Sequence, residues 1–596
     1  MAQSPNLHAD GVLRVTVSSN GRAVPEATQL VSVDIQRAVN TIPSARIVIA
    51  DGDVATQKFP ASDAADFAPG AKIKIAAGYG DEEATVFEGV VVKHGVKITG
   101  ENYSRLVVEC RDAAVAMTVG RKNANFVDKT DSDIIGKLIG DHGLTAKVGA
   151  TSNQHKELVQ YYCTDWDFML SRAEVNGLLV IVTDGTVAVQ APDVSGSAAL
   201  SVTYGEDLME FHAEMDARSQ LAAAQAVSWD PKTQAAVLGT EAKPSALNAQ
   251  GNLDSAALAK VVGLASFCLQ TAAPQAKPVL SKWAEAQQVK AGLARIRGRM
   301  KFQGSAKAKV GELITLKGVG ARYSGDVFVG AVHHELVDGN WITEVEFGVS
   351  PTWFTERPDV VAPSAAGMLP GVEGLQIGVV MKLDGDPENE QKVQVSVPVL
   401  RAATDGVWAR LTKFYGSDGF GAFFIPEIGD EVILGYLNND PSHPVILGSV
   451  YSSKRKPPYS LTAENNLKAV VTRCKSKIEF NEEDKVITIT TPGNNKLIFS
   501  DKDKSILLQD QNNNKLELNP SGITMDSPKD IKISAKGTIS IDAIGTVSIS
   551  SKADVKTAGL NVNCEAQVGF VAKGTATAEV SAAGQTTVKG AMVMIN

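Results

Sequence analysis

The sequence predicts a mainly β protein built from several domains and ending in a stiff, repetitive rod. Its 596 residues are too many for one hydrophobic core, so about four domains are expected. Its 52 glycines, together with abundant Val, Ile, Thr and Ser, favour strands and tight turns. Its last quarter repeats short strand-like segments with few residues between them. These features predict β-rich globular domains followed by a fibrous segment.

Residues 471–596 are predicted to form a β-helix needle. From Lys477 onward, strand-like segments follow at steps that shorten from about ten residues to eight. Alternation within each segment points one set of side chains inward and the other outward. Six apolar residues fall on the eight-residue step in two sets and are the predicted needle core: Ile531, Ile539 and Val547, and Ile533, Ile541 and Ile549. Gly537 and Gly545 occupy matching turns, as is typical of a β-solenoid or β-helix.

Each layer of such a needle is too thin to bury a core alone. The layers must therefore stack within one chain, or identical chains must wrap together. The repeat does not separate these arrangements, because three eight-residue faces could also close one turn of a single chain. A homotrimer and a monomeric adhesin with a single-chain solenoid both stay open at this point.

The needle lacks the residues that catalysis and sugar binding usually need. From Lys477 to the end it contains no His, Trp or Tyr. The carboxylates of 482–484 and 501–503 lie in predicted turns beside lysines and are better explained as solvated charges than as a glycosidase pair. We therefore expect a mechanical role and no enzyme activity, with a trimeric tailspike-like protein that binds or cleaves glycans as the alternative.

Residues 1–363 are predicted to hold two small β-barrels with α/β insertions. Alternating segments over 12–120 predict the first barrel, and the same pattern returns over 300–348. Between them, Thr130 followed by Asp133 is typical of a capping box, so a helix is expected to begin there and end near Gly143. Further helices are expected over 164–177 and Leu280–Arg297, with Gly298 ending the last.

Residues 364–374 read as a linker, and residues 375–452 contain five strand-like segments that predict an OB-fold barrel. Residues 453–470 form a Pro-containing neck. We expect the aromatic residues of this region to fill the barrel and pack against the preceding domain: Phe414, Tyr415, Phe420, Phe423 and Phe424.

Charge and cysteine content exclude several classes of protein. The net charge of −9 and the few basic residues around the OB aromatics argue against a nucleic-acid partner. The five scattered cysteines predict neither a disulfide framework nor a zinc site.

The N-terminus has no Sec-type signal, so we expect cytoplasmic assembly without a signal peptide. His333 and His334 point to opposite faces of a predicted strand, so we do not expect them to share a metal ion. For the chain we predict no metal site, no cofactor and no catalytic residue.

The segment 419–459 resembles the OB-fold signature of VgrG spike proteins of contractile injection systems. The matching elements are Ile425-Pro426, Gly429-Asp430-Glu431-Val432, Asp440-Pro441, His443-Pro444, Gly448-Val450-Tyr451 and Pro457-Pro458. The segments 165–179 and 332–347 resemble the hub of the same family. The order of parts also matches: two hub barrels, an OB domain and a β-helix.

The resemblance implies a homotrimer that fuses a phage tail hub to a tail spike. Three copies with two barrels each present six quasi-equivalent positions to a sixfold tube. Inner-tube and baseplate proteins are the implied partners at the hub, with possible effector cargo and a transient target membrane. The chain shows no lysozyme-like insertion and nothing after the needle, which speaks against a built-in effector. A type VI secretion system and an extracellular phage-tail-like particle both stay open.

The chain's last residues are uncharged and mostly apolar, and such an end on three chains suits a docking plane for a PAAR-type tip protein. The predicted docking residues are Ala591, Met592, Val593, Met594, Ile595 and Asn596. The alternative is a frayed terminus. After docking and firing, the protein is expected to be released or translocated with the injection particle.

Overall fold

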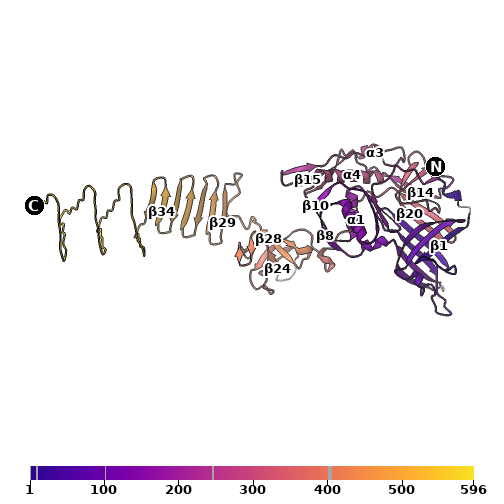
Figure 1. Cartoon of the computed structure of the whole chain (residues 1–596), viewed down its shortest axis with the longest axis horizontal. Coiled ribbons are helices and arrows are strands. Elements are labelled where there is room, and N and C mark those ends of the chain that lie inside the picture. The colour runs from indigo at the N-terminus through magenta and orange to yellow at the C-terminus, as the bar shows by residue number, and fades with distance from the viewer. Residues whose placement is uncertain (1, 9–10, 101–102, 245–246, 401–405, 596) are drawn as a thin grey trace. The chain divides into compact units, whose positions relative to one another are not determined.

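The structure, a computed structural model, describes residues 2–8, 11–100, 103–244, 247–400 and 406–595 (Figure 1). The chain divides into a unit over Met1–Val450 and a second over Tyr451–Asn596. We describe each by itself. Strands outnumber helices in both the hub and the OB domain, so the predicted mainly β class is confirmed.

A thirteen-stranded sheet dominates the first unit. Its first half consists of β1 (Leu13–Ser19), β2 (Arg22–Ala23), β3 (Leu30–Ala38), β4 (Ser44–Ala50), β5 (Lys72–Tyr79), β6 (Glu82–Thr99) and β7 (Tyr103–Arg111). Its second half consists of β13 (Leu200–Thr203), β14 (Glu210–Met215), β18 (Ile296–Gln303), β19 (Leu313–Lys317), β20 (Gly325–Val337) and β21 (Asn340–Phe347).

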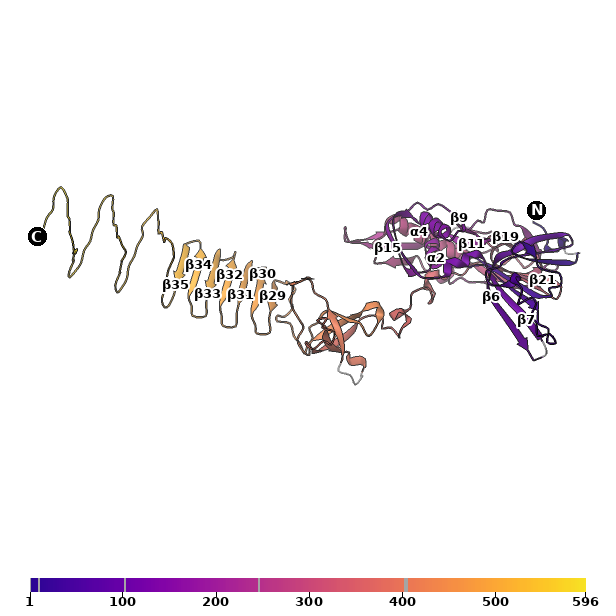
Figure 2. The same ribbon diagram turned by 60° about the horizontal axis from the view of Figure 1, so that its bottom comes forward.

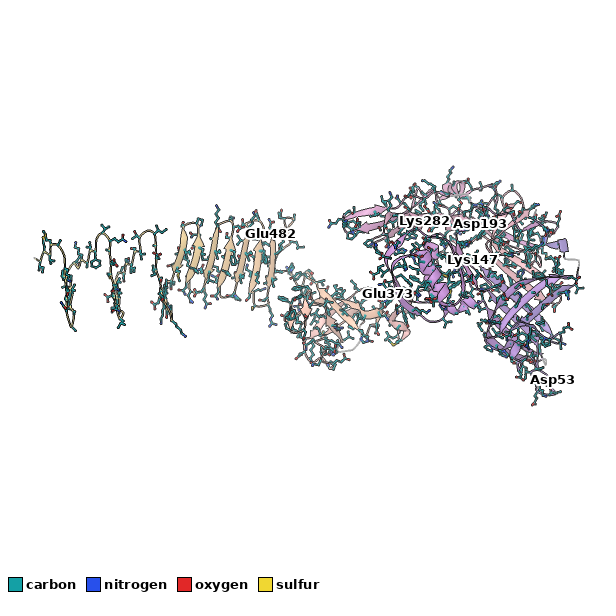
Figure 3. The ribbon with its side chains drawn as sticks, viewed as in Figure 1. Asp53, Lys147, Asp193, Lys282, Glu373 and Glu482 are labelled. Carbon is teal, nitrogen blue, oxygen red and sulfur yellow. The ribbon has the colours of Figure 1, made fainter. Side chains whose placement is uncertain are left out.

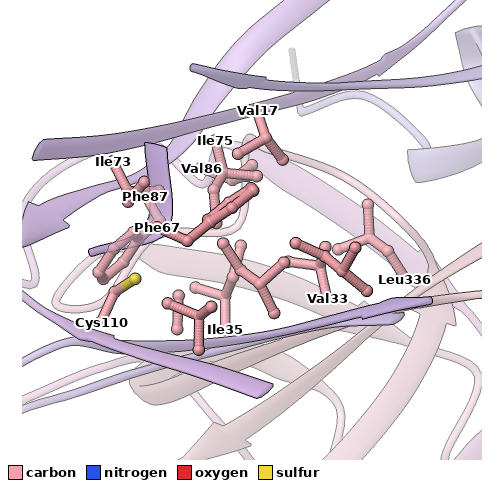
Figure 4. Close-up of a cluster of buried hydrophobic side chains, with 14 of the residues drawn as sticks. Val17, Val33, Ile35, Phe67, Ile73, Ile75, Val86, Phe87, Cys110 and Leu336 are labelled. Atoms are coloured by element: carbon pink, nitrogen blue, oxygen red, sulfur yellow. The ribbon is translucent and has the colours of Figure 1, made fainter. Parts of the chain in front are cut away.

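Each half of this sheet has its own core. Ile35 and Phe87 (Figure 4) and Ile47 are fully buried in the first half, and Met300 and Val345 are fully buried in the second. The two predicted barrels are therefore two halves of one continuous sheet, which β3 and β20 join by antiparallel pairing. Local alternation predicts such strands, but pairing between distant segments depends on tertiary packing.

Two small α/β insertions interrupt the hub. The first contains β8 (Lys122–Thr130), α1 (Asp131–Asp141), β9 (Thr145–Val148), β10 (Gln154–Cys163), α2 (Asp165–Val175), β11 (Leu179–Thr183) and β12 (Thr186–Gln190). The predicted capping box of α1 is confirmed, because Thr130 and Asp133 exchange side-chain to backbone hydrogen bonds of 3.2 Å. Trp166 and Met169 of α2 pack into the same core as Ile135 and Ile139 of α1.

The second insertion contains β15 (Ala224–Asp230), β16 (Ala235–Leu238), α3 (Ser255–Val262), β17 (Phe267–Thr271) and α4 (Lys277–Leu293). The predicted helix over Leu280–Arg297 is wrong at its end, because Arg297 and Gly298 lie in β18. Gly298 is needed inside the sheet rather than as a helix stop. A Cβ there would lie 2.3 Å from the carbonyl oxygen of His212 on the neighbouring strand.

The OB domain is a closed five-stranded barrel, as predicted, with the order β22-β23-β24-β28-β27. Its strands are β22 (Gln376–Lys382), β23 (Val393–Ser396), β24 (Val407–Leu411), β27 (Glu431–Tyr436) and β28 (Pro444–Ser449). Aliphatic side chains fill it: Val380, Val393, Val395, Ala409, Val432, Leu434 and Ile446.

The expectation that OB aromatics fill this barrel is wrong. Phe414, Tyr415, Phe420, Phe423 and Phe424 are all exposed, Phe414 at 88% and Phe423 at 82%. They belong to the long connection from β24 to β27, which carries only the short β25 (Gly416–Ser417) and β26 (Phe420–Gly421). The aliphatic side chains of the strands, with Ile425 of this connection packed against them, already fill the barrel interior.

The second unit begins with a seven-stranded antiparallel sheet in strict sequence order. Its strands are β29 (Leu467–Val471), β30 (Lys477–Asn481), β31 (Val486–Thr490), β32 (Lys496–Ser500), β33 (Ser505–Gln509), β34 (Lys515–Asn519) and β35 (Gly522–Asp526). The sheet thus starts at Leu467, inside the segment predicted as the neck.

Beyond Asp526 the structure corrects the prediction of strands over 530–563. Within the described residues 527–595 the single chain forms no strand and instead bends at every eighth residue, from Pro528 to Met592 (Figure 1). The extended segments between these bends do not pair with one another. The predicted β-helix is therefore absent from the described residues of a single chain.

Candidate assembly surface

One face of the seven-stranded sheet is a continuous apolar surface. Its side chains form two cross-strand rows, set by the register of the strand pairs. The first row is Ile478, Ile489, Leu497, Leu508, Leu516 and Met525. The second row is Phe480, Ile487, Phe499, Ile506, Leu518 and Ile523. We call these twelve residues the apolar face.

The opposite face of the same sheet is mostly polar. Lys477, Thr490, Lys496 and Gln509 follow one another across the strands at positions that alternate with the apolar rows. Alternation over five-residue strands separates most apolar side chains from the polar ones, although Val486, Ile498 and Leu507 lie on the mostly polar face. A single sheet layer with one apolar face cannot bury that face by itself.

Turn chemistry fixes this register. At one end of the strands, Asn481 and Ser500 accept hydrogen bonds from the backbone N–H groups of Asp484 and Asp503, at 3.1 and 3.0 Å. At the other end of the strands, Asp510 Oδ1 accepts hydrogen bonds from the backbone N–H groups of Asn512 and Asn514. Asx-type bonds of this kind hold tight turns, and a fixed turn length prevents a one-residue slip that would invert the faces.

The apolar face is exposed in one chain. Ile478, Phe480 and Ile489 retain 41%, 40% and 39% of their accessible surface, although each sits in the middle of a strand. Contiguous apolar surface of this kind marks an interaction site in a soluble protein.

The predicted needle core continues from this face. Ile531 lines an apolar groove with Ile489, Leu497, Leu508, Leu516 and Met525. Further along, the exposed fraction repeats with the eight-residue step: 51%, 52% and 51% for Ile531, Ile539 and Val547, and 69%, 73% and 73% for Ile533, Ile541 and Ile549. Within one chain the structure does not bring these six residues together. Within each set the exposed fraction is nearly the same in every repeat.

The predicted tip residues are exposed at the end of the described chain. Ala591 is exposed, and Met592, Val593, Met594 and Ile595 retain 80%, 49%, 77% and 91% of their accessible surface. Asn596, also predicted to belong to this plane, lies outside the described residues.

The histidine pair of the hub shows no shared site. Nε2 of His333 lies 2.6 Å from Asp34 Oδ2, whereas the ring of His334 is buried on the other face beside Thr343 and Trp341. Across the described part of the chain, His, Cys, Asp and Glu side chains form no group of three or more suited to a metal ion. Nor does any described helix have the length and apolarity to cross a membrane.

Sequence reasoning missed the apolar face, although it predicted the strands that carry it. A signal was present: Lys477, Lys496 and Lys515 begin matching strands at equal spacing. Each unit of this longer repeat contains two strands. Because the units are equally long, the apolar side chains of successive strands fall on the same face of the sheet.

Comparison with known proteins agrees with this arrangement of parts. A family model described as the Alg8 N-terminal domain matches residues 9–338, more than half of the chain. The chain belongs to the Alg8 N-terminal domain family. The type VI secretion system/phage-baseplate injector OB domain matches residues 376–451, and the phage baseplate V C-terminal trimerisation domain matches residues 486–553. The last two matches support the predicted resemblance to VgrG-type spike proteins.

Curated relatives match this chain over short segments. The type VI secretion system spike protein VgrG1a of Pseudomonas aeruginosa is 34% identical over 84 residues, which are 13% of each chain. The actin cross-linking toxin VgrG1 of Vibrio cholerae is 29% identical over 120 residues, 19% of this chain and 11% of the relative. The chain thus spans about a tenth of the length of the curated relatives it matches.

Among solved structures, a type VI secretion component of E. coli, described as similar to the T4 tail proteins gp27 and gp5, is 12% identical. The match covers 73% of this chain and 99% of that one, with a TM-score of 0.39.

Proposed function

We propose that the protein is the structural spike and hub at the tip of a contractile, phage-tail-like injection particle. In this role the hub joins the baseplate and inner tube to a needle that pierces the target membrane. One observation carries the proposal: a duplicated hub, an injector OB barrel and a sheet with an exposed apolar face follow one another in one chain.

The apolar face supports a homotrimeric needle. Full burial of a large aliphatic or aromatic side chain contributes about 1.5–3 kcal/mol, and the residues of the apolar face are already partly covered. About 1 kcal/mol for each of twelve residues would still exceed 10 kcal/mol per chain. Two further copies of the same face are the simplest cover, and the trimerisation-domain match over 486–553 supports three chains.

Beyond Asp526 the same trimer would supply the backbone partners that one chain lacks. Extended segments from three copies can pair between chains at every eight-residue layer. Such a needle unfolds only when many layers separate together, so its unfolding is slow, as a piercing device requires.

The surroundings of the needle carboxylates support a mechanical role without catalysis. Asp484 Oδ1 lies 2.9 Å from Nζ of Lys502, and Asp503 Oδ2 accepts a hydrogen bond of 2.9 Å from the Ser500 hydroxyl. Glu482 follows β30 at a turn of the sheet (Figure 3). These contacts support solvated turn charges, and we propose no glycan-cleaving activity.

The exposed apolar end is proposed to receive a PAAR-type tip protein. Three copies of Val593, Met594 and Ile595 at the end of a trimeric needle would present apolar surface and unpaired backbone at once. Cargo, the target membrane and assembly in the cytoplasm belong to the same proposal.

Electron microscopy of the purified full chain tests this function. We expect particles with threefold symmetry in which a ring is followed by a slender rod. Single-chain rods without symmetry would contradict the proposal and favour the monomeric adhesin.

A further inference from the structure

The two halves of the hub sheet repeat one strand order. The first half runs β3-β4-β7-β6-β5-β1 and the second runs β14-β18-β21-β20-β19-β13, each strand pairing with the next. Thus β3 corresponds to β14, and β6 corresponds to β20. The orders differ only in that β13 runs parallel to β19, whereas β1 runs antiparallel to β5.

Strand register extends this correspondence to single residues. Val108 of β7 pairs with Ile47 and His94, and Val345 of β21 pairs with Met300 and Val332. His94 therefore corresponds to Val332. In both β6 and β20 a one-residue bulge precedes this position, so the equivalence also holds through the irregularity.

The chain shows how one such half joins another. Strand β20 pairs with β3 over seven residues, with His334 opposite Ile35 and Leu336 opposite Val33. These four side chains are buried, at 3%, 0%, 4% and 2% exposure. On the other face, His333 bonds to Asp34.

The corresponding edges at the two ends of the sheet are unpaired. In the described residues, β14 pairs only with β18, and β6 beyond Val91 pairs only with β7. The β6–β7 hairpin projects from the hub (Figure 2). Val96 and Ile98 on this projection are 45% and 65% exposed, although their equivalents His334 and Leu336 are buried. An edge strand with exposed apolar side chains is a template for another strand.

We propose that residues 93–99 of β6 pair antiparallel with residues 210–216 at β14 of a second copy of this chain, in the register of the β20–β3 junction. Transferring that register places Ile98 opposite Phe211, Val96 opposite Ala213 and His94 opposite Met215. These residues form the inner face of the contact. On the outer face, Lys97 lies opposite His212, Gly95 opposite Glu214 and Lys93 opposite Asp216.

Both faces of this contact are chemically matched. Phe211, Ala213 and Met215 already pack at the border of the second core, so Val96 and Ile98 would extend it. The outer row of β6 carries Lys93 and Lys97, and the outer row at β14 carries Glu210, Glu214 and Asp216.

The charges continue a pattern present on either side. Lys93 already lies 3.1 Å from Glu109 of β7, and Glu214 lies 2.9 Å from Arg297 of β18. Pairing of β6 with β14 of the next copy would continue this alternation of positive and negative side chains from one copy to the next. Opposite charges in neighbouring strands favour pairing, whereas like charges oppose it.

This contact is heterologous, because one edge of each copy meets the other edge of the next, and repetition closes a ring when the rotation allows it. The inference rests on the proposed homotrimer and deepens it by naming the surface through which the hub closes.

Engineered disulfides test the contact in the full chain. Val96→Cys with Ala213→Cys joins one opposite pair, and Lys97→Cys with His212→Cys joins the next. One of two successive pairs in an antiparallel ladder is the narrow, non-hydrogen-bonded kind that a disulfide spans. All variants carry Ser in place of the exposed Cys268, Cys474 and Cys564.

We expect at least one double variant to give linked dimers and trimers on a non-reducing gel. The single variants of a linking pair should not link by themselves, but the two single variants of that pair should link when they are coexpressed. The control Val96→Cys with Glu214→Cys points the second thiol to the other face and should not link.

A charge exchange gives an independent measurement. Lys93→Glu with Lys97→Glu should lower the yield of linked species by about tenfold or more, and adding Glu214→Lys with Asp216→Lys should restore part of it. Trimers by light scattering without linked species in either pair would overturn this contact and leave the proposed function standing. A monomer in solution would overturn both.

Discussion

Nε2 of His333 lies 2.6 Å from Oδ2 of Asp34, a hydrogen bond between side chains 299 residues apart in the sequence. It crosses the junction of β20 and β3, which makes one sheet of the two hub halves. The next residue, His334, points to the opposite face, where its Nδ1 accepts a hydrogen bond of 3.3 Å from Nε1 of Trp341. On one face His333 thus links β20 to β3, whereas on the other face His334 packs opposite Ile35 of β3 and bonds to Trp341 of β21.

The two histidines give the junction opposite pH dependences. Burial lowers the pKa of His334 to about 3, and the nearby positive charges of Arg37 and His333 add to the effect. Below its unfolded pKa of about 6.5, the unfolded chain binds a proton that the folded chain refuses. The stabilisation from His334 is therefore complete above pH 6.5 and is lost as the pH falls toward 3.

We predict that hub stability falls by about 1.4 kcal/mol per pH unit through His334 between roughly pH 6 and 4. His334→Asn, whose amide oxygen can still accept from Trp341, should be less stable at pH 7 but should show a shallower acid slope. Denaturant unfolding of the full chain at several pH values measures this. An unchanged slope in the variant would show that His334 is not the titrating group.

His333 predicts the reverse dependence. Its hydrogen bond to Asp34 raises the pKa of His333, so its stabilisation is complete below pH 6.5 and is lost as the pH rises through the folded pKa. His333→Gln should therefore destabilise the hub more at pH 6 than at pH 9. Equal destabilisation at both pH values would argue against a charged His333.

A buried ion pair connects α2 to α4. Nζ of Lys290 lies 2.7 Å from Oε1 of Glu174, with both side chains at 10% exposure or less. The other carboxylate oxygen accepts from the Phe354 N–H at 2.7 Å. Lys290→Met leaves this buried carboxylate without its cation, and we predict a loss of about 3–5 kcal/mol in unfolding free energy.

Lys282→Met is the matched control for this pair on the same helix. Its partner Glu285 lies 2.6 Å away, but both side chains are about half exposed, so the expected loss is below about 1 kcal/mol. Adding Glu174→Gln to Lys290→Met should recover much of the stability. Equal losses from both lysine variants would contradict the proposed importance of burial.

The apolar face predicts where the needle tolerates charge. Ile489→Asp would place three carboxylates in the buried interior of a trimer and should prevent its assembly. Thr488→Asp, one residue earlier on the polar face, should leave the trimer intact. Light scattering measures the mass of both variants. A trimeric Ile489→Asp protein would show that the apolar face lies on the outer surface of the trimer.

The eight-residue region offers an equally matched pair. Ile541→Asp should block assembly, because Ile541 belongs to the predicted needle core. Ile544→Asp makes the same chemical change at a bend, where the side chain is fully exposed in one chain. We expect Ile544→Asp to assemble normally. Assembly of both variants would exclude Ile541 from the core.

Local sequence signals predicted local structure well. The Thr130–Asp133 capping box located α1, and five alternating segments located the OB barrel. In each case the deciding interactions lie within a few residues or between neighbouring strands. Alternation also identified every strand from β30 to β35, because each is regular over its full length.

Long-range features were beyond the same signals. The junction of β3 with β20 depends on packing between segments far apart in the chain, so neither strand shows it by itself. The strands expected after Asp526 do not form in one chain. We propose that their pairing partners come from other copies, which the sequence of one chain does not reveal. Phe423 and its aromatic neighbours are exposed because the β24–β27 connection runs outside the barrel, which composition alone does not reveal.

The mass of the purified full chain in solution, measured by light scattering, tests the central claim most directly. A homotrimeric spike predicts three times the 62.8 kDa of one chain, independent of concentration. A stable species of 62.8 kDa would contradict it.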